Sequence, residues 1–291
     1  MGDSIQYIVI YGFILGSIYL LISLGFSLIC GVLRIFHLGY AYIFPLTVYG
    51  TWMFMQELKW DLIPSLLGMV VIQFLIAFLI YKFVVKKYLE REEILLTALL
   101  LVALIVEQVA NYVYPVQAGV YLNTTLIDGT MTIGAVVVST QLVVGSILAL
   151  IMTGLFIIFF VKTKTGLAVR AISQSIYTSQ IVGIGVENLY IFTMMIVLLP
   201  VILGMLMVAP VWNIEPGMGW LYMTTAILVA VLGGLGNIKG TILASFLIGI
   251  THAIMCFVVG EPRFMNLSAL ILVIIILIIR PQGLARSESL W

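Results

Sequence analysis

Long apolar runs, interrupted by short groups of charged, glycine and proline residues, dominate this sequence of 291 residues. Hydrophobic residues make up 63% of it and charged residues only 9%, whereas a soluble domain carries about 25% charged residues because its surface faces water. The runs are continuous and lack the alternation of barrel strands. The sequence therefore predicts an all-α polytopic membrane protein, with one transmembrane domain over residues 1–291.

We expect about nine membrane-spanning segments, because a spanning helix needs roughly 20 mostly apolar residues and each run ends at glycine, proline or charge. The second run contains Pro45, and the seventh is short. Short or interrupted spans point to a transport pathway, since broken backbone survives at membrane depth only where protein or water satisfies it. The expected segments are Ile5–Cys30, Leu38–Met55, Leu62–Val85, Ile94–Tyr114, Val136–Val161, Leu189–Pro210, Leu221–Leu235, Thr241–Val259 and Leu267–Ile279.

Basic residues indicate the orientation of these segments, because cytoplasmic loops carry an excess of lysine and arginine. With the N-terminus outside and the C-terminus in the cytoplasm, only Lys59 and Arg263 of the 13 basic residues fall outside. This orientation also requires an odd number of spans. The other basic residues, all expected in the cytoplasm, are Arg34, Lys82, Lys86, Lys87, Arg91, Lys162, Lys164, Arg170, Lys239, Arg280 and Arg286.

The stretch GGLGNIKGT, from Gly233 to Thr241, raises the question of nucleotide binding. A phosphate-binding loop needs G-x-x-x-x-G-K-[ST], but no glycine directly precedes Lys239 here.

The two cysteines, Cys30 and Cys256, lie in apolar runs without a CxxC or Cys/His grouping, so no metal site is indicated. The net charge of +1 gives no indication of nucleic acid. We expect no nucleotide, metal, cofactor or nucleic-acid site in this chain.

Two segments of the chain show a weak internal sequence similarity. The stretches from Gly31 to Arg34 and from Gly236 to Lys239 each place a glycine and a basic residue at a cytoplasmic turn before the next apolar segment. Internal repeats with broken helices are common in transporters. The sequence leaves open whether such a repeat is present.

The longest polar cytoplasmic segment, residues 162–185, predicts a short helix from Leu167 to Ile181, ended by Gly183 or Gly185. Four polar residues recur on one face at helical spacing, with isoleucines interleaved. Two interpretations are open: an interfacial helix with its apolar side in lipid headgroups, or a docking helix for a soluble partner. The polar residues are Arg170, Ser173, Gln174 and Thr178.

Four stretches resemble, in order, the permease subunits of branched-chain amino-acid ABC importers, the LivH-like group, which also includes urea and short-amide permeases. GLAVRAISQSIYTSQIVGI resembles the cytoplasmic stretch of that family, and VLGGLGNIKGTILASFLIGI resembles its glycine-rich stretch. EPGMGW resembles the motif before the seventh span, and RPQGL the one that ends the domain. Each motif alone is weak, but four in order, collinear from Leu15 to Leu284, are a strong match.

The resemblance implies a non-enzymatic permease of the cell membrane that imports small neutral solutes, above all branched-chain or hydrophobic amino acids. It implies ATP and magnesium on two separate cytoplasmic ATPase subunits, an external substrate-binding protein, and a related second permease, with a heterodimer favoured over a homodimer. It also implies that segment 162–185 contains the helix that couples to the ATPase. The matching positions are Gly166, Ala168, Arg170, Ala171, Gln174 and Gly183.

The chain departs from the family pattern at positions that bear on the substrate. The stretch after the first span, His37 to Phe44, changes four polar or small positions. A lysine usual in the seventh span is Thr225, and an acidic residue usual in the eighth is His252. A branched-chain amino acid as substrate is therefore an extrapolation, whereas transport itself is no less expected.

Polar residues inside spans are candidates for the substrate pathway, because ionisable groups in lipid are expensive unless they face protein or water. Glu107 and Asn111 either line the path or form a network between helices. His252 either binds substrate or packs inside the protein. His37, Tyr40 and Tyr42 face a pore if the second span is broken at Pro45, and otherwise lie at the interface. The predicted pathway residues are His37, Tyr40, Tyr42, Glu107, Asn111, Thr225, Gly233, Gly234 and Gly236.

Two further expectations remain. The outer loop, residues 115–141, has a hairpin signal at Asp128-Gly129 and serves either as contact for an external binding protein or as a lid.

The alternative function is a secondary transporter or channel driven by an ion gradient, which needs acidic or histidine relays at mid-membrane. Glu107 is the only acid within a predicted span, which disfavours a proton relay.

Overall fold

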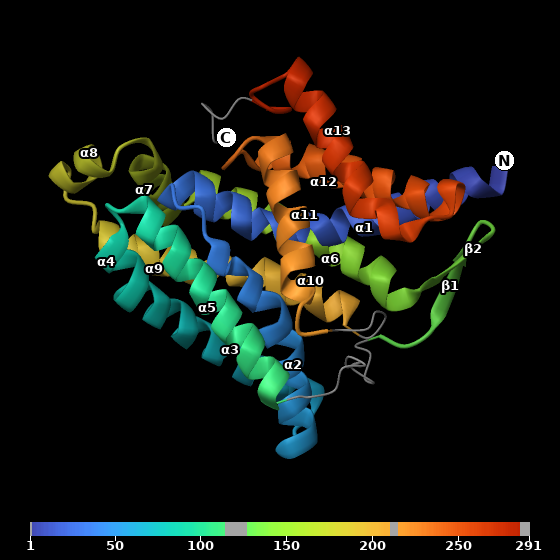
Figure 1. The fold of residues 1–291 in the computed structure, drawn as a ribbon, viewed down its shortest axis with the longest axis horizontal. Coiled ribbons are helices and arrows are strands. Elements are labelled where there is room, and N and C mark those ends of the chain that lie inside the picture. Colours follow the sequence, from blue (N-terminus) through green and yellow to red (C-terminus); the bar gives the residue numbers. More distant parts are fainter. Residues whose placement is uncertain (1, 114–126, 210–214, 286–291) are drawn as a thin grey trace.

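The structure, a computed structural model, describes residues 2–113, 127–209 and 215–285, and these form helices around one long central helix (Figure 1). Shorter 3₁₀ and π-helical turns extend or join several of them. The helices are α1 (Gly2–Leu28), α2 (Ile43–Glu57), α3 (Leu62–Ile80), α4 (Lys86–Tyr88), α5 (Glu92–Val113), α6 (Thr140–Lys162), α7 (Lys164–Gln174), α8 (Ile176–Ile181), α9 (Val186–Ile196), α10 (Leu198–Val208), α11 (Met218–Gly233), α12 (Ile238–Ile254) and α13 (Met265–Ile279).

Seven helical stretches in the described part are long and apolar enough to cross a bilayer, which confirms an all-α polytopic membrane protein. Helix α11 is apolar but shorter, as the sequence predicts for the seventh span. The count of nine spans and the orientation stay predictions. The seven stretches are Ser4–Gly31, Leu62–Tyr88, Glu92–Val113, Thr140–Lys162, Val186–Val208, Ile238–Val259 and Pro262–Ile279.

Helix α1 is the centre of the fold, with 94% of its most apolar stretch buried, against 11% for the stretch that contains α13. Its closest neighbour is α12. A Cβ on Gly16 would meet the backbone of Phe246, and one on Gly249 would meet the backbone of Gly12 and Gly16. Small residues let helices approach this closely. The α1–α12 pair therefore forms a tightly packed core that lacks room for side chains at these positions.

The second span is interrupted, but before Pro45 rather than at it. A 3₁₀ turn, η2 (Leu38–Tyr42), precedes α2, and Pro45 is the third residue of α2. A proline in the first helical turn is tolerated because its missing N–H would have no helical partner. The predicted sixth span is divided in the same way, because α9 ends at Ile196 and α10, with Pro200 near its start, begins at Leu198.

The loop predicted to lie outside contains a hairpin, but its turn is not at Asp128-Gly129 as predicted. Strands β1 (Thr130–Ile133) and β2 (Val136–Ser139) pair antiparallel around the turn Gly134-Ala135. Gly134 has φ 63°, which suits glycine in a two-residue hairpin loop. The predicted fifth span therefore starts too early, since residues 136–139 form β2 and α6 begins at Thr140. Residues 115–126 of this loop lie outside the described part.

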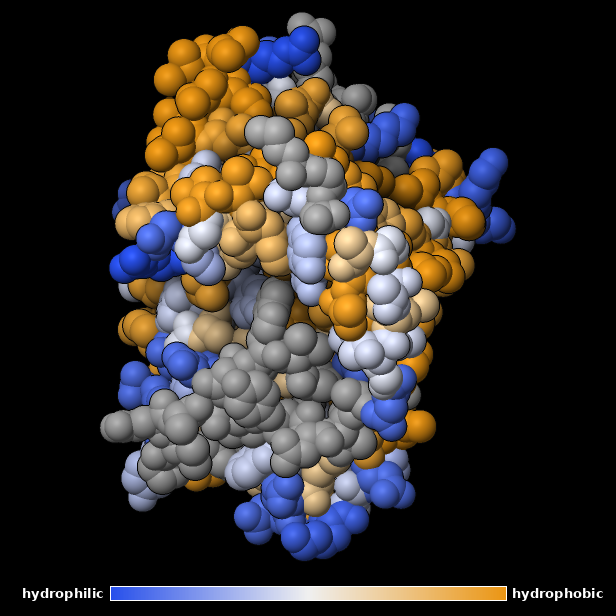
Figure 2. Space-filling model, turned by 90° about the vertical axis from the view of Figure 1, so that its right-hand side faces the viewer, coloured by the Kyte–Doolittle hydropathy of each residue, from blue (hydrophilic) through white to orange (hydrophobic). Residues whose placement is uncertain are grey.

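The loops predicted to share one side of the membrane meet at one end of the molecule. Lys86 Nζ lies 2.6 Å from Glu187 Oε1, Arg34 donates to the Ser173 carbonyl, and Ser27, near the end of α1, accepts from the Gly236 N–H. The hairpin lies at the other end of α1 (Figure 1). Figure 2 looks onto that hairpin end, with hydrophilic residues around its edge and hydrophobic residues over its upper part.

Candidate functional site

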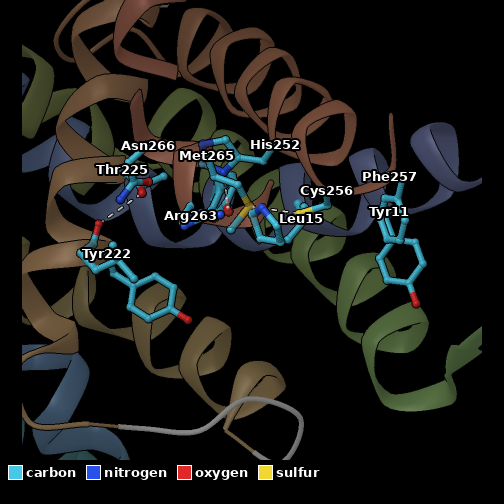
Figure 3. A pocket seen from close by; sticks show the side chains of 13 residues that line it. Tyr11, Leu15, Tyr222, Thr225, His252, Cys256, Phe257, Arg263, Met265 and Asn266 are labelled. Carbon is cyan, nitrogen blue, oxygen red and sulfur yellow. Dashed lines mark hydrogen bonds between the residues drawn. The ribbon is translucent and has the colours of Figure 1, made fainter. Parts of the chain in front are cut away.

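A cavity of about 490 Å³ lies among α1, α11, α12 and α13. Tyr11 and Phe257 pack together at one end of it, with ring centroids 4.7 Å apart, and Thr225 and Asn266 lie toward the other (Figure 3). Its walls are mostly apolar and aromatic. The residues that line it are Tyr11, Leu15, Tyr19, Leu221, Tyr222, Thr225, His252, Cys256, Phe257, Pro262, Arg263, Met265 and Asn266.

A histidine–tyrosine pair is the main polar feature of the cavity wall. The Tyr19 hydroxyl lies 2.8 Å from His252 Nδ1, and both side chains are buried. When Tyr19 donates to Nδ1, the ring carries its hydrogen on Nε2. Among the described residues Nε2 has no hydrogen-bond partner of good geometry, although the Met265 backbone lies beside the ring. The pair therefore joins α1 to α12 at the cavity wall through a hydrogen bond in an apolar setting.

Thr225 contributes a second polar group, and the cavity interior carries no acid among its lining residues. The Thr225 hydroxyl donates to the Leu221 carbonyl at 3.2 Å, which leaves its oxygen free to accept. The one cation of the lining is Arg263. Its side chain is 75% exposed and pairs with Glu261 at 2.7 Å, so it lies at the rim. Pockets of this kind, apolar with a few placed polar groups, suit small neutral ligands.

Three predicted pathway residues lie at η2 within the protein: His37 directly precedes it, and Tyr40 and Tyr42 belong to it. His37, Tyr40 and Tyr42 are all buried, and the Tyr40 hydroxyl donates to the Ile22 carbonyl at 2.8 Å. Neither ring nitrogen of His37 has a hydrogen-bond partner among the described residues. Burial lowers the pKa of His37 to about 4. The three side chains pack in the interior of the chain, and a pathway role for them stays a prediction.

Glu107 and Asn111 lie apart from the cavity. Trp220 Nε1 donates to Glu107 Oε2 at 2.6 Å, which ties α5 to the start of α11. Asn111 is exposed. The contact with Trp220 is the kind of inter-helix network that the sequence left open as an alternative. A pathway role for the two residues stays a prediction.

The glycine-rich stretch is a close contact between helices. A Cβ on Gly240 would collide with the carbonyl of Gly233, and one on Gly234 would collide with that of Ala285. Gly234 and Gly236 have φ of 93° and 81°, which favours glycine. The Asn237 side chain then caps α12 by accepting from the Gly240 N–H at 3.0 Å. These glycines do not line the cavity, and their place in the pathway stays a prediction.

Segment 162–185, predicted to be cytoplasmic, forms two helices, α7 and α8, instead of the single one predicted. Ser175 interrupts them with an extended backbone, and its hydroxyl accepts from the Thr178 N–H. Gly183 ends α8 as predicted: it has φ 85°, its N–H donates to Gln180 and the Ile184 N–H to Ser179, which is a Schellman motif. Gly166 packs where a Cβ would meet the backbone of Phe160.

The outward face of these helices differs from the predicted polar face. Ser173 is buried at 4% exposure, so it faces the protein. Gln174 is exposed, Ala168 and Ala171 are half-buried, and Arg170 is half-buried and donates to the Val161 carbonyl at 3.3 Å. Large apolar side chains are also exposed on this segment. They are Leu167 at 59%, Tyr177 at 74%, Ile181 at 68% and Val182 at 74%.

Long apolar helices, interrupted spans and a cavity among the helices are together typical of polytopic membrane transport proteins. Comparison with known proteins specifies it further. The family model described as "Branched-chain amino acid transport system / permease component" matches residues 8–279. The chain belongs to this family, whose permease components are non-catalytic, multi-pass transport subunits of the cell membrane.

Two relatives and one solved structure show the extent of the similarity. The chain is 23% identical to the high-affinity branched-chain amino acid transport permease LivH of Escherichia coli K12, over 94% of this chain and 92% of that protein. It is 30% identical to the corresponding protein BraD of Pseudomonas aeruginosa, over 56% of this chain and 53% of that one. The fold resembles that of PsaBC from Streptococcus pneumoniae in complex with Fab, with TM-score 0.50 and 15% identity, over 94% of this chain and 92% of that one.

Sequence reasoning named Thr225 and His252 without predicting that they meet in one cavity. It missed Tyr19 and Tyr222, because tyrosines in an apolar helix give no signal of the face on which they lie. It also missed Asn266, which lies one residue into α13. A polar residue at a helix start is usually attributed to the end of the span.

Proposed function

We propose that this chain is the membrane-spanning permease subunit of an ABC importer that moves a small neutral solute, an amino acid with an apolar side chain. ATP is hydrolysed with magnesium on two separate ATPase subunits. An external binding protein delivers the solute, and a related second permease completes the pore, with a heterodimer favoured over a homodimer. The family match from residue 8 to 279 carries the proposal.

Two separate sites, the exposed surface of α7 and α8 and the cavity, support a permease that contacts an ATPase at one place and a solute at another. The exposed apolar side chains of α7 and α8 lie at the end of α1 opposite the hairpin (Figure 1). A patch of this kind fits a protein partner. The cavity reaches the loop between α12 and α13 at Pro262 and Arg263. One end is thus suited to an ATPase, and a separate cavity is suited to the solute.

The chemistry of the cavity supports a neutral substrate. Its aromatic and aliphatic walls fit an apolar side chain, and Thr225 and Asn266 offer hydrogen bonds to the polar end of a solute. A side chain with a net charge would find no counter-charge in the interior, and burying an unpaired charge is expensive. Both relatives named above transport branched-chain amino acids by name.

Purification tests the assembly. The chain, produced with its neighbouring transport components and extracted in mild detergent, is expected to co-isolate with ATPase subunits that hydrolyse ATP. The alternative, a secondary transporter driven by an ion gradient, predicts instead that the chain purifies alone and transports without ATP. Solute uptake that persists with no ATPase bound would contradict the proposal.

A further inference from the structure

Arg34 is the contact between α7 and the end of the central helix. Its Nη2 donates to the Ser173 carbonyl at 2.8 Å and to the Gln174 carbonyl at 3.3 Å, and its Nε donates to Ser173 at 3.2 Å. These carbonyls belong to the last residues of α7, where the helix leaves its acceptors unpaired and its dipole favours a cation. A planar guanidinium holds two such acceptors at once.

The backbone around Arg34 has an unusual conformation. Helix α1 continues as a π-helix, η1 (Ile29–Leu33), and Arg34 follows with φ 53° and ψ 30°. A left-handed backbone is disfavoured for a residue with a side chain, and π-helical turns occur often at functional sites. The contacts with α7 therefore hold a conformation that the local sequence does not favour. A displacement of α7 would act on this segment first.

A row of five aromatic rings leads from this segment to the cavity. Phe36 lines a groove together with Arg34 and with Ile176 of α8. Successive ring centroids are 5.3 Å apart from Phe36 to Phe26, 5.5 Å to Tyr40, 5.7 Å to Phe44 and 5.7 Å to Tyr222.

The two ends of the row belong to different sites. Tyr222 lines the cavity, whereas Phe36 lies two residues from Arg34. The three inner rings, Phe26, Tyr40 and Phe44, are each 0% exposed. Close-packed interiors have low compressibility and transmit displacement. The rings thus form one contiguous packed connection between the end of α7 and the wall of the cavity.

We infer that Arg34 is a positioning residue for coupling: it joins α7 to the aromatic row Phe36–Phe26–Tyr40–Phe44–Tyr222, which carries movement of α7 to the cavity. This rests on the proposed function, in which α7 contacts the ATPase. Arg34 is not among the residues that line the cavity. Its role is to fix the segment between η1 and η2 relative to α7, so that ATP-driven movement reaches Tyr222.

The test uses the complete complex in proteoliposomes, with ATP hydrolysis and leucine uptake measured on the same samples. For Arg34→Gln we expect ATP hydrolysis within about twofold of wild type, and leucine taken up per ATP reduced about tenfold or more, as for loss of charge-assisted hydrogen bonds. Arg34→Lys keeps the charge but loses the planar fork of donors. Its leucine uptake per ATP should therefore lie between those of the wild type and Arg34→Gln. Lys86→Gln, which breaks an exposed ion pair at the same end, should keep the wild-type ratio.

A second variant, Phe44→Leu, tests the aromatic row itself. It also tests the inference if the complex with Arg34→Gln fails to assemble. Phe44→Leu should lower the uptake-to-ATP ratio as well, and adding Arg34→Gln should lower it little further, because both act on one connection. Phe54→Leu, outside the row in a contact with Trp60, should have no effect on the ratio. An unchanged ratio in Arg34→Gln and Phe44→Leu, or a parallel fall of hydrolysis and uptake, overturns the inference. A wild-type complex without ATP-driven uptake overturns the proposed function itself.

Discussion

Single residues decide the chemistry of the cavity, and two adjacent threonines on α11 show this most clearly. Thr225 lines the cavity and is buried, whereas Thr224 is exposed. Both hydroxyls donate to the carbonyl four residues earlier. They therefore make the same helical contact and differ in what their oxygen atoms face.

Replacing each threonine by valine separates these surroundings. Thr225→Val removes an acceptor from the cavity wall, and we expect the KM for leucine uptake to rise about two- to tenfold, the range for one hydrogen bond. Thr224→Val should leave KM unchanged, and thermal stability should be similar in both. An equal KM for the two variants would show that the cavity does not bind the solute.

A buried histidine gives a pH dependence that can be assigned to one residue. His37 keeps a neutral ring in the folded protein because burial lowers its pKa to about 4, while in an unfolded chain the ring takes up a proton below about pH 6.5. The free energy of unfolding that it contributes is complete above pH 6.5 and falls as the pH drops toward 4.

His37→Leu should therefore remove part of the acid sensitivity. Between pH 6.5 and 5 we expect the wild type to lose about 2 kcal/mol more stability than the variant. Melting of the detergent-purified protein over this range measures it. Parallel loss of stability in the two proteins would mean that the ring is not buried in the neutral form.

At the scale of elements, α7 is the structure on which the coupling proposal depends. Arg170 lies on it, half-buried, with its Nη2 directed to the Val161 carbonyl of α6. We expect Arg170→Glu to lower ATP-driven uptake about tenfold or more, because it reverses a charge at the contact and loses a charge-assisted hydrogen bond. Lys82→Glu, at the same end but outside α7, is the matched control. Uptake in Arg170→Glu at the wild-type rate would contradict a docking role for α7.

The sequence predicts elements better than it predicts where they break or meet. Apolar run length locates the spans to within a few residues, because the bilayer sets a minimum length. It misplaces the start of α6 and the break near Pro45, since β2 is itself apolar and a proline early in a helix does not interrupt it. The sequence predicts Gly183 as a helix end correctly, because a glycine cap depends only on the local backbone geometry.

Contacts between distant segments could not be predicted in this way. His252 and Thr225, 27 positions apart in sequence, line one cavity, and Arg34 contacts Ser173 across 139 positions. The polar face predicted for α7 included Ser173, which the structure buries beneath Arg34. Helical spacing shows which residues share a face, but it does not show which face packs against the protein.

At the scale of the whole molecule, the proposed function assigns the ATPase contact to one end and the solute to a separate cavity. The described part of the chain has no candidate metal cluster of three or more ligands, and its glycine-rich stretch is a helix contact. The proposed function takes the energy for transport from partner ATPase subunits and the alternative takes it from an ion gradient, and these two sources predict different requirements for uptake.

Uptake by the reconstituted complex decides between them. Proteoliposomes that contain the permeases and ATPases, supplied with the binding protein outside and ATP inside, should accumulate leucine, isoleucine or valine in preference to lysine and glutamate. Accumulation should stop when ATP is replaced by a non-hydrolysable analogue and should not change when ion gradients are collapsed. Accumulation that continues without ATP and follows an ion gradient would contradict the account.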